Sequence, residues 1–345
     1  MASNTIHCEI IAYDLIEPIA IQIDEEHNAI YALTNYQLTR IDLNTNKDNV
    51  QIVCQHSRKF QGMDVDDDNE NYSQGESDDD RDMPRVSDPF EDSEPSTDDD
   101  EEKITNRRNW RRYGWRIYQL DNPCSILFLS DNNQLVVLNE GVIKFLTIEL
   151  EDNRSFVQGP SKNIFCYDFD VFNNGGKRLS VQPWSIALTS TVGVFVFSLL
   201  DNSQLYTLDI RNQHTIIQTL TTTVIHNCPC LLFHPQSNKI FVYDSTQILA
   251  MSPDDGTTVN VDLPFIERGK IISTMAIDKI GHIYILSDST IFKCTWQSQL
   301  HLVECLGKID VSISDTRMIV TDQGNQFYFS DMGKGCLYRC RKING

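Results

Sequence analysis

The pattern of hydrophobic and polar positions along this chain is that of a β-protein. Short runs rich in Ile, Val, Phe and Tyr alternate with turns rich in Asn, Asp, Gly and Ser along much of its 345 residues. Runs of this kind are typical of strands, and no window keeps the periodicity of an amphipathic helix. The pattern therefore predicts an all-β fold.

One phrase repeats along the chain: an apolar strand, a polar turn, a second strand with an aromatic or branched centre, and a third strand. Its six copies are residues 18–43, 124–148, 184–210, 230–252, 273–296 and 317–340. Alignment of the second strands places in register Tyr31, Val136, Phe195, Phe241, Tyr284 and Tyr328. The last three steps between these residues, 46, 43 and 44, match the length of a four-stranded propeller blade. The copies predict a six-bladed β-propeller.

The two ends of the chain are expected to meet in the last blade. Only 17 residues follow Tyr328, which leaves room for one more strand at 335–341. The missing outer strand is predicted to come from the N-terminal segment IHCEIIAY, residues 6–13, which precedes the first copy. Such closure removes the exposed sheet edges that would template aggregation.

The step of 105 residues after Tyr31 contains an acidic insertion. The formal net charge is −20, and residues 64–102 hold 19 Asp and Glu against two arginines. A segment with such one-sided charge and low hydrophobicity cannot bury enough apolar surface to fold. We therefore predict a long disordered acidic insertion, 61–103, after the first blade of a single domain formed by 6–60 and 104–345.

The repeats resemble six-bladed propellers of the broad NHL, gluconolactonase (senescence-marker-like) and YncE-like group. The shared phrase is an apolar strand, a turn and a second strand that begins [IF][YF]; the fourth copy contains FVYDS at 241–245. For the gluconolactonase family, the resemblance would place a motif glutamate on Glu17 and a metal-binding aspartate on Asp244. The pattern breaks at Trp184-Ser185 and at Pro229-Cys230, where the family has asparagine ligands and Asn-Gly. We therefore predict no metal site, no catalytic residue and no cofactor.

The insertion carries two kinds of candidate contact. Four hydroxyl residues have an acidic residue three positions on, the arrangement that an acidophilic kinase reads, and each phosphate would deepen the negative charge; they are Ser73, Ser77, Ser96 and Thr97. The tripeptide Asp88-Pro89-Phe90 resembles the short peptides that dock on clathrin-adaptor appendages. An incidental turn is the alternative for the tripeptide.

A basic and aromatic stretch follows the insertion, with the candidate partner-binding residues Arg107, Arg108, Trp110, Arg111, Arg112 and Trp115. Arginine and aromatic side chains together are typical of single-stranded RNA binding, and the resemblance to NHL propellers implies the same. In a second interpretation the aromatics are already part of a strand and the arginines form a solvated edge. In a third, the acidic insertion folds back on these arginines.

The ten cysteines and the absence of a leader indicate the compartment. The N-terminus has no basic and apolar leader pattern, and no apolar run is long enough to span a membrane. Most cysteines lie in strand-like runs and are expected to be buried thiols. We predict a cytoplasmic or nuclear protein that is not secreted and does not contact a membrane.

The predicted function is a non-enzymatic protein-interaction scaffold. Its propeller rim and its phosphorylatable acidic loop would bind other proteins, through preformed surfaces with little ordering cost. The alternatives are an RNA-binding NHL-type propeller that uses residues 107–118 and a metal-dependent, lactonase-like hydrolase. The oligomeric state is left open.

Overall fold

A computed structural model gives the fold. It describes residues 5–15, 17–34, 37–44, 50–55, 120, 123–129, 133–139, 142–151, 154–165, 183–199, 202–211, 216–221, 230–243, 247–267, 269–313, 316–321 and 326–342. The chain divides into two compact units, Met1–His56 with Tyr118–Gly345, and Ser57–Ile117. The second unit, and with it the predicted disordered insertion 61–103, lies outside the described residues. The sheets described belong to the first unit.

The regular structure of the described residues is all β, as predicted. Among these residues, no helix has the length and apolarity needed to cross a membrane. Four antiparallel four-stranded sheets follow one another along the chain. The first two are β2 (Pro18–Asp24), β3 (Ala29–Thr34), β4 (Gln37–Asp42) and β5 (Val50–Gln55), then β6 (Ser125–Leu129), β7 (Gln134–Asn139), β8 (Val142–Glu151) and β9 (Arg154–Phe165). The next two are β10 (Pro183–Leu188), β11 (Val194–Leu199), β12 (Asn202–Asp209) and β13 (Ile216–Thr221), then β14 (Cys230–His234), β15 (Lys239–Tyr243), β16 (Ile248–Met251) and β17 (Thr258–Asn260).

A fifth sheet holds eight strands in the order β18-β19-β20-β21-β1-β24-β23-β22. Their bounds are β18 (Ile272–Ile277), β19 (Ile283–Ser287), β20 (Thr290–Trp296), β21 (Leu300–Ile309), β22 (Thr316–Val320), β23 (Gln326–Asp331), β24 (Cys336–Lys342) and β1 (Thr5–Ala12). Strand β1 pairs antiparallel with β24 and, over two residues, parallel with β21. The predicted pairing of the N-terminal segment beside 335–341 is therefore confirmed.

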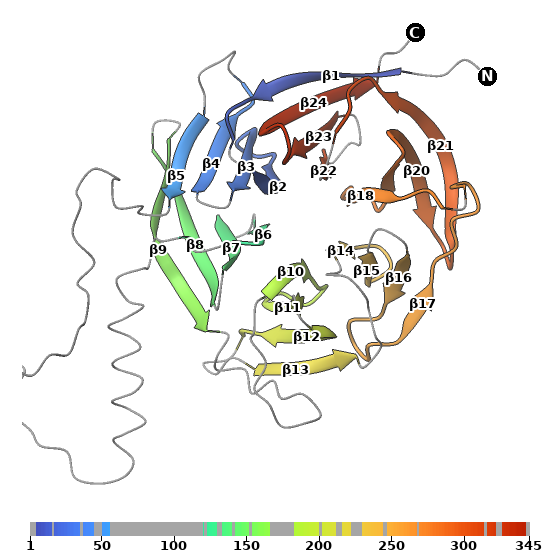
Figure 1. The fold of residues 1–345 in the computed structure, drawn as a ribbon. Helices are drawn as coiled ribbons and strands as arrows, with labels where there is room; N and C mark the ends of the chain where they lie inside the picture. The colour runs from blue at the N-terminus through green and yellow to red at the C-terminus, as the bar shows by residue number, and fades with distance from the viewer. Residues whose placement is uncertain are drawn as a thin grey trace, which may run out of the picture. The chain divides into compact units, whose positions relative to one another are not determined.

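The sheets of the first unit are arranged around a common centre, with their first strands innermost (Figure 1). The second strand of each repeat is buried from both sides, because neighbouring sheets pack face to face on it; in β3 every residue is buried. The six residues aligned by the repeat all lie in these second strands and are at most 2% exposed: Tyr31, Val136, Phe195, Phe241, Tyr284 and Tyr328. The propeller-like all-β fold is thus the one that the repeats predict.

The cysteines differ from expectation at the closure of the ring. Cys8 of β1 lies directly opposite Cys340 of β24, and the two form a disulfide with Cα atoms 4.1 Å apart. The expectation of buried thiols is wrong for this pair, because antiparallel pairing of the two chain ends brings together residues that are 332 positions apart. Cys294 and Cys336 are buried free thiols, as expected, and Cys305 is an exposed one.

The turn before β24 requires a glycine. Gly335 has a φ of +62°, and a Cβ atom there would lie 2.5 Å from the carbonyl oxygen of Leu15. The close approach arises because the Leu15 amide donates a hydrogen bond to the Gly335 carbonyl, at 2.9 Å. This contact ties the segment between β1 and β2 to the closing strand β24.

Replacement of Gly335 by alanine is expected to lower the free energy of unfolding by about 2–3 kcal/mol, because the new Cβ adds a clash to an unfavourable φ. Gly269→Ala is the matched control, since Gly269 has a φ of +87° but nothing within 4 Å of the added atom. We expect the control to cost about 1 kcal/mol. Urea unfolding measures both, and equal losses would show that the Leu15 contact has no energetic weight.

Candidate functional site

A pocket of about 90 Å³ lies where the innermost strands meet, and it is called the central pocket here. Each of the strands β2, β6, β10, β14, β18 and β22 contributes to its wall. The described lining residues are Ala20, Ile21, Gln22, Cys124, Ser125, Ile126, Trp184, Ser185, Ile186, Cys230, Leu231, Leu232, Tyr243, Thr274, Met275, Arg317, Met318 and Ile319. One strand from every repeat therefore builds a single site.

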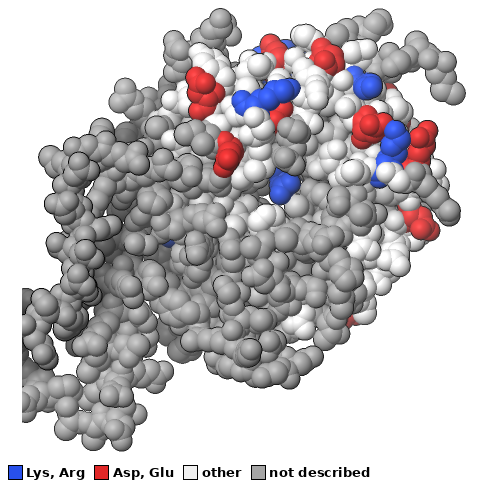
Figure 2. Space-filling view, in the orientation of Figure 1, with Lys and Arg blue, Asp and Glu red and all other residues white. Residues whose placement is uncertain are grey.

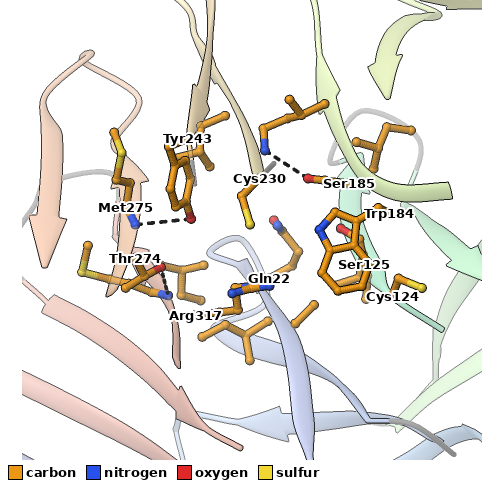
Figure 3. A pocket seen from close by; sticks show the side chains of 18 residues that line it. Gln22, Cys124, Ser125, Trp184, Ser185, Cys230, Tyr243, Thr274, Met275 and Arg317 are labelled. Carbon is orange, nitrogen blue, oxygen red and sulfur yellow. Dashed lines mark hydrogen bonds between the residues drawn. The ribbon is translucent and has the colours of Figure 1, made fainter. Parts of the chain in front are cut away.

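Side-chain hydrogen bonds fix neighbouring inner strands to one another around this pocket (Figure 3). The Ser185 hydroxyl oxygen of β10 accepts the Leu231 amide of β14 at 3.0 Å. The Thr274 hydroxyl oxygen of β18 accepts the Met318 amide of β22 at 3.2 Å. Small hydroxyl residues at these positions thus satisfy backbone donors that face the adjacent sheet, where an apolar residue would leave them unpaired.

Tyr243 contributes a polar group from the second strand of its sheet. It lies opposite Cys230 in the β14–β15 pairing, and its hydroxyl accepts the Met275 amide at 3.4 Å. Burial raises the pKa of Tyr243 above its ordinary value, and Cys230 raises it further, whereas the positive charge of Arg317 opposes this shift. Tyr243 therefore stays a neutral phenol at the edge of the pocket.

Arg317 is the one formally charged side chain among the described lining residues, and none of these is Asp or Glu. Figure 3 shows Arg317, Gln22 and Cys230 directed into the space between the inner strands. The described lining thus combines one cationic side chain with neutral amide, hydroxyl and thiol groups. A wall of this kind favours a negatively charged or polar ligand over a cation.

The central pocket does not fit a hard metal ion. Such ions take several oxygen ligands, chiefly carboxylates, and the described lining supplies none. No group of three or more His, Cys, Asp or Glu side chains is placed for a metal anywhere in the described ranges. Of the two residues that the resemblance nominated, Glu17 is exposed between β1 and β2 and does not line the pocket, and Asp244 lies outside the described residues.

The other site residues nominated from sequence lie outside the part of the chain that the structure describes. These are Ser73, Ser77, Asp88, Pro89, Phe90, Ser96, Thr97, Arg107, Arg108, Trp110, Arg111, Arg112 and Trp115. Phosphorylation of the insertion, protein binding by the rim and the acidic loop, and RNA binding by residues 107–118 therefore stay predictions.

Three residues that the sequence had singled out for another reason line the central pocket. Trp184, Ser185 and Cys230, noted as departures from the gluconolactonase pattern, all line it. Gln22, Tyr243 and Arg317 were missed. Gln22 and Arg317 lie in the first strand of a repeat copy, so an alignment of first strands would have marked their positions, but Tyr243 reaches the pocket from a second strand.

The described part of the face seen in Figure 2 carries charges of both signs. Acidic and basic side chains lie close together on the face seen in Figure 2, in the region where Figure 1 places β1, β21 and β24. Arg339 and Glu9 form an ion pair there, at 2.6 Å. On its described part, this face therefore shows interspersed charges and not a patch of one sign.

Comparisons with known proteins give the fold but no family. No family model and no curated protein matches the sequence. Among solved structures, a luciferin-regenerating enzyme is similar, with a TM-score of 0.57, 10% identity, and coverage of 98% of this chain and 96% of the other. The Cps50 (Swd1) β-propeller domain of Myceliophteria thermophila is also similar, with a TM-score of 0.53, 7% identity, and coverage of 98% and 100%. A gluconolactonase of Xanthomonas campestris is similar as well, with a TM-score of 0.51, 11% identity, and coverage of 97% of this chain and 89% of the other.

These comparisons correct one prediction. A protein that is not an enzyme was expected, because no catalytic motif is visible in the sequence. That prediction is wrong: the similar propellers include a luciferin-regenerating enzyme and a gluconolactonase, so the comparison points to enzyme-type propellers. At such low identities the likeness shows the fold alone. The chain has an all-β propeller fold that resembles gluconolactonase-like structures.

Proposed function

We propose that this chain is an enzyme-type β-propeller that binds a small molecule in the central pocket. The observation that carries the proposal is the joint lining of this pocket by β2, β6, β10, β14, β18 and β22. Concave sites with apolar walls and a few convergent polar groups are the usual places for small ligands. Here Ile21, Ile126 and Met318 supply apolar wall, and Gln22, Ser125 and Arg317 supply polar groups.

We further infer that the strand groups around the pocket are six blades. Four of them are the separate four-stranded sheets, and the two halves of the eight-stranded sheet, joined where β1 meets β21, would be the others. In this arrangement each blade gives its first strand to the wall. The ligand would then be held by positions far apart in sequence, on a frame of rigid strands.

The proposal is tested by narrowing the pocket. Ser125 lies in β6 with a half-buried side chain in the pocket wall. Ser125→Leu would add bulk to a cavity of about 90 Å³. We expect molecules that bind the wild-type chain to lose affinity by about tenfold or more, because the added atoms occupy their space.

Saturation-transfer NMR with a library of small neutral and anionic molecules measures this binding on the full chain. Ser190→Leu is the control for the same change of side chain, since Ser190 is exposed in the turn after β10 and does not line the pocket. Circular dichroism confirms that both variants fold. If every bound molecule kept its affinity in Ser125→Leu, or if no molecule bound at all, the central pocket would not be the ligand site.

A further inference from the structure

The position of Arg317 in the wall is fixed by its strand. Its backbone lies in β22, opposite Ser330 of β23, and the Arg317 amide donates to the Ser330 hydroxyl at 3.1 Å. The next residue, Met318, donates its amide to Thr274 of the neighbouring β18. Arg317 is thus held between β23 and the inner strand β18, and Figure 3 shows its side chain directed into the pocket.

The Arg317 guanidinium donates to the backbone carbonyl of Thr316 at 3.5 Å, and the other polar side chains that line the pocket are neutral hydrogen-bonding groups. Gln22 offers an amide, and Ser125 and Ser185 offer hydroxyls. The Ser185 oxygen accepts the Leu231 amide, and its hydroxyl can also donate one hydrogen bond. Tyr243 remains a phenol, since burial raises its pKa. A planar guanidinium with neutral donors nearby matches the oxygen atoms of a carboxylate or phosphate.

The size of the pocket limits the ligand. Its volume of about 90 Å³ is well below the 300 Å³ or so at which drug-sized ligand sites begin. It is nevertheless several times the space that one water needs. Met275, Met318 and Ile319 add short apolar wall beside Arg317. The space therefore fits one oxyanion group that carries a few further carbon atoms.

We propose that the central pocket selects small molecules bearing a carboxylate or phosphate group, and that Arg317 is the residue that determines this specificity. The inference rests on the proposed function, because it takes the central pocket as the ligand site. The guanidinium would bind two oxygen atoms of the anion, and the hydroxyl and amide groups of the wall would orient the remainder.

The test compares charged and neutral probes of the same shape on the full chain. The probes are L-lactate, its neutral amide L-lactamide, and inorganic phosphate, titrated by calorimetry at fixed ionic strength. We expect lactate or phosphate to bind about 10- to 100-fold more tightly than lactamide, the range given by a charge-assisted hydrogen bond. Lactate binding without phosphate binding would assign a carboxylate ligand, and the reverse would assign a phosphate ligand.

Variants at Arg317 give the second readout. Arg317→Gln should remove the preference of the chain for the anion over lactamide. Arg317→Lys should keep part of this preference, because lysine retains the charge without the planar fork. The ratio of the two affinities, rather than either affinity alone, separates anion recognition from a general loss of structure. Arg211→Gln is the control, since Arg211 is exposed, pairs with Asp209 and does not line the pocket.

The outcomes separate this inference from the proposed function. Equal affinity for lactate, phosphate and lactamide, or an unchanged ratio in Arg317→Gln, would overturn the role of Arg317. If neutral molecules still bound in a manner that Ser125→Leu abolishes, the ligand site would stand without anion selection. Absence of binding by every probe and every library molecule would overturn both.

Discussion

Reduction of the Cys8–Cys340 disulfide is expected to lower the free energy of unfolding by about 4–5 kcal/mol. The bond joins residues 332 positions apart and so ties one end of the chain to the other. In the chain-entropy account, a cross-link across so long a loop removes much of the freedom of the unfolded chain. Urea unfolding of the full chain, with and without a phosphine reductant, measures the difference.

The stability lost with the covalent cross-link must be separated from the stability lost when the two buried sulfur atoms are removed from the packing. Cys8 and Cys340 are both buried, so the variant Cys8→Ala with Cys340→Ala also loses packing. It should therefore unfold slightly more easily than the reduced wild-type chain. Cys305→Ser removes an exposed free thiol, and we expect a change within about 0.5 kcal/mol. Identical unfolding of the oxidised and reduced chains would contradict the prediction.

The disulfide also bears on where the chain works. Disulfides persist in oxidising compartments and are rare in the cytoplasm and nucleus, where sequence reasoning places this protein. In a reducing compartment, closure would depend on the β1–β24 ladder, on the Arg339–Glu9 ion pair and on the Cys8 amide, which donates to Asp310 at 2.9 Å. The location remains a prediction, and imaging of a tagged chain tests it.

The sequence repeat predicts the fold well because its apolar positions are the buried positions of the second strands. A residue such as Tyr31 or Phe241 lies in a strand with a packed sheet on either side, so its apolar centre recurs with each sheet. The pairing of residues 6–13 beside 335–341 followed from counting strands, since the last repeat lacked one. Both inferences depend only on periodicity and on the need to cover sheet edges.

The chemistry of the central pocket could not be predicted in the same way. Its wall takes two or three residues from each inner strand. These residues are far apart in the sequence, so no short motif shows that they lie together in the fold. Arg317 resembles a solvated arginine in the sequence, because its neighbours do not show that β22 faces the pocket. Cys8 and Cys340 are equally remote from each other along the chain, and only the register of β1 on β24 makes them partners.

The second large effect is expected at Tyr284, a buried residue of β19 that joins neighbouring strand groups. Its ring packs edge-on against Phe327 of β23, with centroids 5.2 Å apart, and its hydroxyl donates to Asp278 at 3.1 Å. Tyr284→Ala should lower the free energy of unfolding by about 3–5 kcal/mol, because it leaves a cavity between packed groups of strands that the surrounding structure cannot fully close. Urea unfolding followed by fluorescence measures the loss.

Tyr284→Phe separates the ring from the hydroxyl. It keeps the contact with Phe327 but removes one donor to Asp278, which still accepts the backbone amide of His282 at 2.7 Å and contacts its imidazole at 2.9 Å. We therefore expect a loss of only about 1–2 kcal/mol. If the phenylalanine variant were as unstable as the alanine variant, the hydroxyl network at Asp278 would hold these strands together, and the packing between strand groups would be secondary.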